Sequence, residues 1–176
     1  CADEIGATWT ILRPTSLWGP WFDTPYRDFF TMIGKNRYVH PGQVRTLKQW
    51  GFIGNSVYQI GKLLEAPAES VHKRTLYLAD YVPTELREFA DKVQTSLGAE
   101  PIRTVPTGIL KAAAGIGSTM QKLGWKTPPL TRFRLRNMLA SEVQNVEPLR
   151  EIVGPAPYGL DEAIDITGKW LREYGF

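Results

Sequence analysis

The stretch TILRPTSLWGPW, residues 10–21, decides how the rest of this sequence is interpreted. Its first three residues are typical of a buried strand, and Arg13-Pro14 leads into a loop rich in tryptophan, glycine and proline. In open α/β proteins, strands that end in such loops lie inside a sheet, and ligands bind at their carboxyl ends. Only nine residues precede this stretch, and the first is not methionine. We therefore expect an incomplete sheet and a chain truncated at Cys1.

The composition limits the classes of protein that this chain can belong to. Its 176 residues are 43% hydrophobic and 22% charged, which is typical of a globular protein with a real core. A net charge of +3 is compatible with an anionic small ligand and too small to predict nucleic-acid binding. A single cysteine excludes an internal disulfide and favours a reducing, cytoplasmic location. We predict neither a secretory signal nor a membrane span.

Strands and helices are expected to alternate along the chain. Apolar runs predict two buried strands at residues 8–13 and 74–80, and the second has the composition of a parallel-sheet strand. Shorter strands are expected at 37–42, 44–53 and 101–106. Helices are expected at 24–36, 56–66, 84–98, 107–123, 133–144 and 159–176, with a loop at 126–131 and a helical turn closed by Gly6. This alternation predicts α/β architecture with too few strands for a complete sheet.

Helical periodicity also predicts which faces are buried. In the helix at 56–66, Val57, Ile60 and Leu64 share one face, and Asn55-Ser56 could cap its first turn. The helices at 84–98 and 159–176 are strongly amphipathic, with these residues on the face predicted to be buried: Leu86, Phe89, Ala90, Val93, Leu97, Leu160, Ala163, Ile164, Thr167, Trp170, Leu171 and Tyr174.

Four segments, in order, resemble the carboxyl half of the extended short-chain dehydrogenases/reductases, the NAD-dependent epimerase/dehydratase family. The first is EIGATWTILRPTSLWGP, which is similar to a helix end, a strand and an Arg-Pro-x-x-x-Tyr-Gly-Pro motif, with Trp18 in place of the tyrosine. Residues 48–67, 75–100 and 150–175 resemble later segments of the family. The family's paired aspartates correspond here to Asn55-Ser56.

The resemblance implies a partial Rossmann-type sheet of late strands with a mostly helical substrate-binding subdomain. Residues 1–24 and 74–100 would supply the Rossmann strands, and 25–73 and 101–176 the substrate-binding elements. The family's Gly-rich dinucleotide turn is absent, and its catalytic Tyr-x-x-x-Lys is expected upstream of Cys1. NAD or NADP would thus be bound mainly by the missing half, and a homodimer is possible for the full-length protein.

The resemblance also suggests which residues bind ligands. Pro14 and Thr15 would approach the nicotinamide, and Ser16 would face the substrate; the alternative is a purely structural loop. His40 corresponds to a base or sugar pocket, although a histidine before Pro-Gly is more often a turn residue. Gln49 stands where nucleotide-sugar enzymes carry a phosphate-binding arginine, and neighbouring Lys48 could substitute as a point charge.

A basic cluster forms a second candidate. Arg132 and Arg134, with Arg136, suit phosphate or carboxylate capture, and one of the first two lies near the family's second phosphate-binding arginine. The alternative is a solvated helix face with Phe133 and Leu135 buried between the arginines.

One pair resembles a catalytic motif in the wrong place. Tyr58 and Lys62 share a helix face. This is the geometry that a lysine needs if it is to lower the pKa of a tyrosine for proton transfer. The pair follows the Arg-Pro strand instead of preceding it, so we interpret this segment as a surface helix. No His/Cys/Asp/Glu cluster has metal-ligand spacing.

Together these patterns predict the substrate-binding half of an NAD(P)-dependent epimerase, dehydratase or reductase that acts on a nucleotide-sugar or related alcohol. The piece alone should be inactive. One alternative is a nucleotide-binding scaffold or subunit with the same fold and no catalysis. A more distant alternative is a free-standing interaction module.

Overall fold

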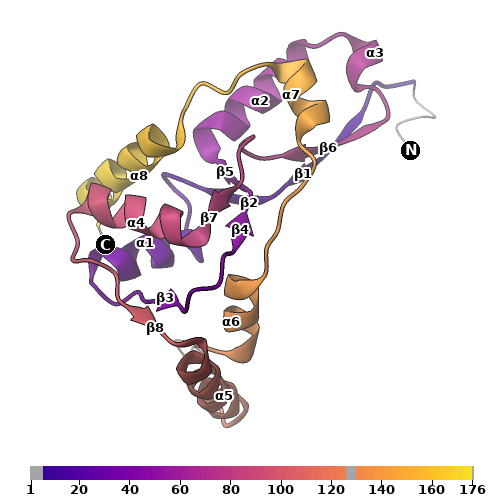
Figure 1. Cartoon of the computed structure of the whole chain (residues 1–176). Coiled ribbons are helices and arrows are strands. Elements are labelled where there is room, and N and C mark those ends of the chain that lie inside the picture. The colour runs from indigo at the N-terminus through magenta and orange to yellow at the C-terminus, as the bar shows by residue number, and fades with distance from the viewer. Residues whose placement is uncertain (1–5, 126–129, 176) are drawn as a thin grey trace. The chain divides into compact units, whose positions relative to one another are not determined.

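The computed structural model describes residues 6–125 and 130–175, and within them the chain forms two compact units (Figure 1). The first unit comprises residues 1–28, 49–84 and 143–176. The second comprises residues 29–48 and 85–142. The predicted turn before Gly6 lies outside the described residues, and so does the loop at 126–129. The division into four sequence segments stays a prediction.

Parallel strand pairs form the centre of the first unit. Strand β1 (Thr10–Pro14) pairs with β6 (Arg74–Leu78), and Thr10 lies opposite Arg74 and Pro14 opposite Leu78. Strand β2 (Ser16–Trp18) pairs in parallel with β5 (Trp50–Phe52). Both strands that the apolar runs predicted are therefore confirmed, as is the α/β class with small parallel sheets.

Helices cover one face of the β1–β6 pair (Figure 1). Leu76 and Leu78 pack there with Leu63 of α2 (Ile53–Glu65), Val71 of α3 (Ala68–Val71) and two residues of α7, a helix over Glu147–Val153 that the periodicity did not predict. Adjacent residues of a strand point to opposite faces, and Ile11, on the other face, is 47% exposed. The prediction that β1 is buried was wrong for this face, since the helices cover only the side of Leu12.

Helix α2 reverses the face that its apolar residues predicted. Val57, Ile60 and Leu64 are exposed, and Leu64 is 83% accessible. The buried side instead carries Leu63 and three polar residues: Asn55, Ser56 and Gln59. The reason is the partner of this face, since the Gln59 Nε2 amide donates to the backbone carbonyl of Ala79, just after β6, at 2.9 Å. Polar side chains therefore satisfy backbone groups where apolar ones could not.

Helix α8 (Leu160–Tyr174) closes the first unit and largely has the predicted buried face. Its buried residues are Ala163, Ile164, Thr167, Gly168 and Leu171. Trp170 and Tyr174 do not enter the core; they contact the exposed ring of Trp21, whose centroid lies 5.8 Å and 5.0 Å from theirs. The Arg27 guanidinium lies over Trp170, 5.9 Å from the ring centroid.

The second unit has an aromatic core next to short strands. Helix α1 (Tyr26–Gly34) enters it from the first unit, and β3 (His40–Pro41) pairs in parallel with β8 (Thr104–Val105). Strand β4 (Leu47–Lys48) pairs with β7 (Thr84–Glu85), whose Glu85 belongs to this unit. Helix α4 (Leu86–Leu97) ends at Gly98, which takes the left-handed conformation with φ 67° that favours glycine. The core rings are Phe29, Phe30, Tyr38 and Phe89.

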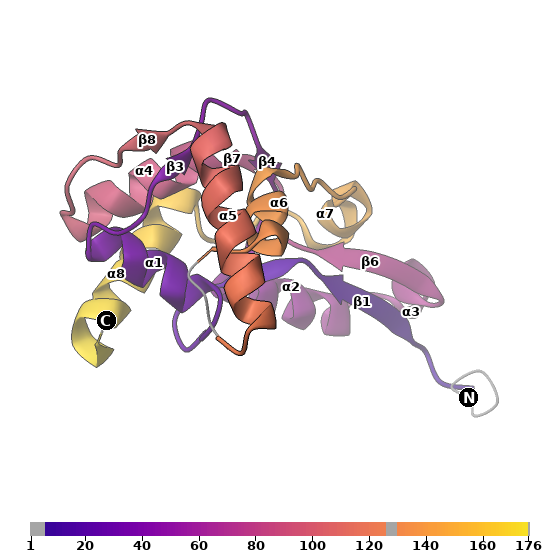
Figure 2. The ribbon, with the colours of Figure 1, turned by 90° about the horizontal axis from the view of Figure 1, so that it is seen from below.

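Two further helices of this unit lie side by side, α5 (Thr107–Lys122) and α6 (Arg132–Leu139) (Figure 2). Helix α6 is shorter than the predicted 133–144. Leu135 is buried as predicted, but Phe133 is 62% exposed and lies beside the Arg136 guanidinium, so its predicted burial was wrong. A helix of eight residues packs only one side, and Phe133 lies outside that side. Within residues 6–125 and 130–175, no helix is long and apolar enough to cross a membrane.

Candidate functional site

The carboxyl ends of β1 and β6 bring the first predicted ligand residues together. Pro14 lies opposite Leu78 at the last position of both strands. The next residue, Thr15, directs its backbone N–H (3.1 Å) and its hydroxyl (3.4 Å) to the Leu78 carbonyl. Ser16 then starts β2 opposite Trp50, and its side chain is exposed. The hydroxyl of Ser16 is therefore presented to solvent at the edge of the sheet where parallel sheets bind ligands.

Behind this edge lies a partly buried polar network centred on Asp80, the second residue after β6. One carboxylate oxygen accepts from the Phe52 backbone N–H at 2.9 Å, and the other accepts from the Asn55 amide at 2.7 Å. The backbone N–H of Asp80 donates to the Trp50 carbonyl at 2.8 Å. Burial raises the pKa of Asp80, and the hydrogen bonds from Asn55 and Phe52 oppose the rise. This carboxylate holds the junction between β5 and α2 in place.

The sequence suggested that Asn55 caps α2, but in the structure it does not. The helix begins at Ile53 after Phe52, so Asn55 lies inside its first turn. Its side-chain oxygen accepts from the Tyr158 backbone N–H, and its amide donates to the Tyr158 carbonyl, both at 3.0 Å. Asn55 thus joins three segments of the first unit: α2, the segment that follows β6, and the loop before α8.

Gln49 uses both ends of its amide within the protein. Its Nε2 donates to the Asp80 carbonyl at 3.0 Å, and its Oε1 accepts from the Gln144 backbone N–H at 2.7 Å. The side chain is buried, with 4% of the residue exposed. The position that the resemblance assigned to phosphate binding therefore holds a structural amide in this chain.

Sequence reasoning missed Asp80. The available signal was its place at the end of RTLYLAD, where an acidic residue directly follows a buried strand at the ligand-binding edge of a parallel sheet. Asn55 was noticed, but its partners lie 25 and 103 residues away along the chain and no local pattern identifies them.

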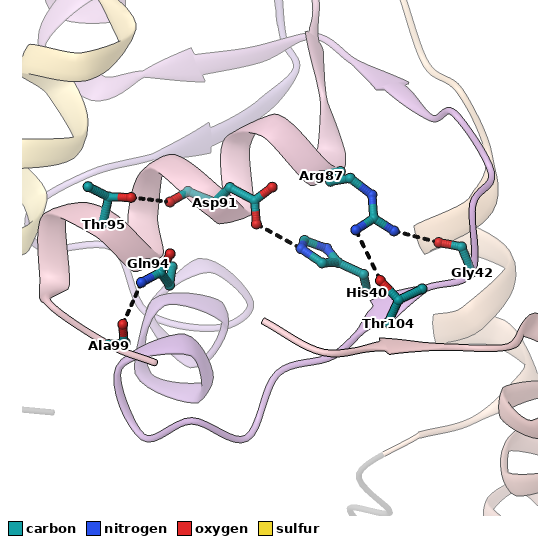
Figure 3. Close-up of polar contacts among 8 residues, drawn as sticks. All are labelled: His40, Gly42, Arg87, Asp91, Gln94, Thr95, Ala99 and Thr104. Atoms are coloured by element: carbon teal, nitrogen blue, oxygen red, sulfur yellow. Dashed lines mark hydrogen bonds and ion pairs between the residues drawn. The ribbon is translucent and has the colours of Figure 1, made fainter. Parts of the chain in front are cut away.

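In the second unit, His40 is buried against α4 (Figure 3). Its Nε2 lies 2.8 Å from the Asp91 carboxylate, and its ring packs edge-on against Tyr38. Burial lowers the pKa of His40, while the hydrogen bond to Asp91 opposes this shift. Burial also raises the pKa of Tyr38 far above its ordinary value. The Nε2 of His40 is thus engaged by Asp91 within the unit. A role for His40 in a ligand pocket stays a prediction.

Arg87 fixes the strands beside His40 (Figure 3). Its guanidinium donates to the Gly42 carbonyl at 2.6 Å and to the Thr104 hydroxyl at 3.1 Å. It therefore joins the segment after β3 to β8. Farther along α4, the Gln94 amide donates to the Ala99 carbonyl and closes the end of the helix.

Lys48, Arg132 and Arg134 also lie in the second unit. The Lys48 ammonium donates to the Asn137 carbonyl at 2.9 Å and lies 3.5 Å from the Glu142 carboxylate. The side chains of Arg132 and Arg134 are exposed on α6. The backbone of Arg134 is held by the helix-capping hydroxyl of Thr131, and that of Arg132 donates to Ser118 at 3.0 Å. Both arginine side chains lie on the exposed side of α6, whereas the Lys48 ammonium is held by the Asn137 carbonyl and the Glu142 carboxylate.

Comparison with known proteins identifies the fold. No protein-family model matches the chain. The uncharacterized protein YbjS of Escherichia coli (strain K12) is 27% identical over 175 residues, which cover 94% of this chain and 50% of YbjS. The structure of UDP-glucose 4-epimerase from Thermotoga maritima, with UDP-glucose, superposes with a TM-score of 0.66 at 13% identity, over 98% of this chain and 48% of that one. The chain has the fold of about half of this epimerase structure.

A human protein of known structure has the same fold over a similar length. The epimerase family protein SDR39U1, solved with NADPH, has a TM-score of 0.67 at 15% identity, over 91% of this chain and 48% of its own. The predicted resemblance to a half of the extended short-chain dehydrogenases/reductases is therefore confirmed at the level of the fold. This chain spans about half the length of the epimerase structures and of YbjS.

The sequence also raised two questions, about the Tyr58/Lys62 pair and about a metal site. Lys62 pairs with Glu65 at 2.8 Å, and its ammonium lies 5.8 Å from the centre of the Tyr58 ring. The hydrogen bond with Glu65 raises the pKa of Lys62, and the ammonium is thus engaged by a carboxylate on the same helix turn. Among the described residues, no group of three or more His, Cys, Asp or Glu side chains could hold a metal ion.

Proposed function

We propose that this chain is the substrate-binding half of an NAD(P)-dependent epimerase, dehydratase or reductase that acts on a nucleotide-sugar or a related alcohol. The observation that carries the proposal is the epimerase fold combined with an exposed serine at the carboxyl edge of β1 and β6. A nicotinamide supplies or accepts a hydride when it is bound. The chain's own residues would position the substrate beside it, which contributes strongly to catalysis.

The residues at the sheet edge fit a nicotinamide. Pro14 and Thr15 are both uncharged, and the Thr15 hydroxyl is turned toward the Leu78 carbonyl. The neighbouring Ser16 hydroxyl can donate to and accept from a substrate hydroxyl. Asp80 and Asn55 hold the start of α2 and the end of β5, which is the strand that pairs with Ser16.

The proposed activity needs a cofactor site and an acid/base pair that this sequence does not contain. It has no Gly-rich dinucleotide turn, and its one Tyr-x-x-x-Lys carries a lysine engaged by Glu65. We therefore propose that the acid/base pair and most of the cofactor site come from other residues of a whole protein. The 176 residues alone are expected to show no turnover.

The test uses the protein expressed from its whole gene. Ser16→Ala should lower kcat/KM for the sugar substrate about ten- to a hundred-fold, the effect of one hydrogen bond to the reacting substrate. It should leave the melting temperature unchanged, because the side chain is exposed. The matched control is Thr75→Ala, an exposed hydroxyl on β6 away from the carboxyl edge. Equal effects of the two substitutions would contradict the proposal.

A second candidate is a nucleotide-binding scaffold without catalysis. The use of both ends of the Gln49 amide within the protein favours it, because no phosphate-binding group stands at that position. The scaffold predicts that the whole protein binds NADH or NADPH and turns over no sugar. Turnover that Ser16→Ala reduces would exclude it.

A further inference from the structure

The charges of this chain are strongly segregated. Residues 101–141 contain seven Lys or Arg and no Asp or Glu, which leaves fourteen basic against eighteen acidic residues in the rest of the chain. The described members in this stretch are all exposed: Arg103, Lys111, Lys122, Arg132, Arg134 and Arg136. A net charge of +3 for the whole chain thus conceals a strongly cationic part of the second unit, formed largely by α5 and α6.

Helix α5 adds an apolar stripe to this cationic part. Ile109, Ile116, Met120 and Leu123 are all exposed, and their spacing of seven, four and three residues places them along one side of the helix. We call these four residues the α5 stripe. Trp125, also exposed, follows at the carboxyl end, where its backbone N–H donates to the Met120 carbonyl at 3.0 Å.

The α5 stripe is not the side on which α5 packs within its unit. The buried residues of the helix are Ala114 and Gly117, and neither belongs to the stripe. Next to them, the Ser118 hydroxyl accepts from the backbone of Arg132 on the neighbouring helix α6 (Figure 2). Lys111 and Lys122 lie eleven residues apart, so they share one line on the polar side of α5.

We propose that the α5 stripe and its basic surroundings dock on the surface of an anionic lipid bilayer. An interfacial helix has this composition, with apolar and aromatic residues on one side, Lys and Arg on the other and no acidic residue. Each exposed cation is attracted by anionic headgroups, while Trp125 has the amphipathic ring that suits the interface. The helix would lie on the membrane without spanning it. This inference is independent of the proposed enzymatic function.

The observations favour a membrane over two other occupants. A second copy of the chain would bring two cationic surfaces together, and like charges repel. A nucleic acid would match the charge but would gain little from four exposed aliphatic and thioether side chains, since phosphate and base recognition use polar and aromatic groups. A lipid surface matches both the charge and the apolar stripe.

The experiment measures co-sedimentation of the 176-residue chain with vesicles of phosphatidylcholine alone or with added phosphatidylglycerol. Binding should require the anionic lipid and weaken as salt is raised. Lys111→Gln/Lys122→Gln should lower the partition coefficient about 25-fold, which is about five-fold per lysine. Lys35→Gln/Lys169→Gln removes the same charge from exposed positions elsewhere and should change little.

The apolar contribution has a closely matched control. Leu123, the C-cap residue of α5, and Leu64 on α2 are both 83% exposed. Leu123→Asp should weaken binding roughly ten- to a hundred-fold, because the stripe loses apolar area buried in the interface; Leu64→Asp should not. Ile116→Asp is a second test inside the helix, and melting curves establish that each variant folds.

Four results would overturn the proposal. They are equal binding to neutral and anionic vesicles, no binding to either, equal losses for Leu123→Asp and Leu64→Asp, and equal losses for the two lysine pairs. Binding of a DNA duplex that Leu123→Asp leaves intact, without vesicle binding, would assign the surface to nucleic acid. A lipid-free dimer that Leu123→Asp dissociates would assign it to a second copy.

Discussion

Asn55→Asp isolates the contribution of the polar network around Asp80, because it changes one atom and keeps the shape of the side chain. An aspartate at position 55 can still accept from the Tyr158 backbone N–H. It loses the donations to the Asp80 carboxylate (2.7 Å) and to the Tyr158 carbonyl (3.0 Å). A hydrogen bond to a charged group contributes about 1.5–3 kcal/mol and a neutral one about 1 kcal/mol, so the loss should be about 2.5–4 kcal/mol at neutral pH.

The loss should depend on pH with a defined sign. Burial raises the pKa of Asp80 in the folded chain, and a second carboxylate beside it raises the pKa values of both further. The destabilisation is therefore complete above the raised folded values and is relieved as the pH falls through them. Once the pH has fallen through these raised values, one shared proton restores a hydrogen bond between the two groups, and most of the loss should disappear.

Urea unfolding followed by tryptophan fluorescence suits this measurement, since Trp9, Trp18, Trp21, Trp50 and Trp170 all belong to the first unit. Asn137→Asp on exposed α6 is the matched control and should shift the free energy of unfolding by at most about 0.5 kcal/mol. A loss below about 1 kcal/mol for Asn55→Asp at neutral pH would refute the reasoning. A loss that stays the same as the pH is lowered from neutral through the acidic range would show that charge is not its cause.

Three further predictions concern other parts of the chain. His40 has a folded pKa below its ordinary value of 6.5, so stability should fall as the pH drops below 6.5 toward the folded pKa; His40→Gln should remove that slope in a thermal-melt pH series. Gln49→Ala should cost about 2 kcal/mol in urea unfolding, because it removes two buried hydrogen bonds, and Gln49→Glu should recover only the one accepted by Oε1. Leu63→Ala should cost about 2–5 kcal/mol and Leu64→Ala at most about 0.5 kcal/mol, since the first is buried and the second is 83% exposed; the reverse order would restore the face predicted from periodicity.

Elements whose partners are local or apolar were predictable from the sequence. The apolar run of β6 and the periodicity of α4, ended by Gly98, predicted both elements to within two residues. Here the hydrophobic pattern and the backbone signal agree, so one interpretation was favoured. The order of four family-like segments extended this local evidence to the fold.

The buried face of α2 was not predictable in the same way. Its apolar residues recur at helical spacing, yet the core accepts Asn55, Ser56 and Gln59. Those side chains are buried because backbone groups near Ala79, Asp80 and Tyr158 need partners, and only the tertiary structure brings them close. Periodicity measures hydrophobicity along the chain and contains no term for such distant polar partners.

Among the candidate ligand residues, some positions were predictable from the sequence and some contacts were not. The edge position of Pro14, Thr15 and Ser16 follows from the strand itself and was predictable. The engagement of Gln49 with Gln144, and of Lys48 with Glu142, joins segments about ninety residues apart and was not. The ligand roles of all these residues stay predictions.

The most direct test of the central claim compares turnover by the 176-residue chain and by the protein from its whole gene, with NAD or NADP and a panel of nucleotide-sugars and alcohols. The account predicts no turnover by the 176-residue chain, and turnover by the whole protein that falls about ten- to a hundred-fold with Ser16→Ala. Oxidation or epimerisation of a sugar by the 176-residue chain itself would contradict it.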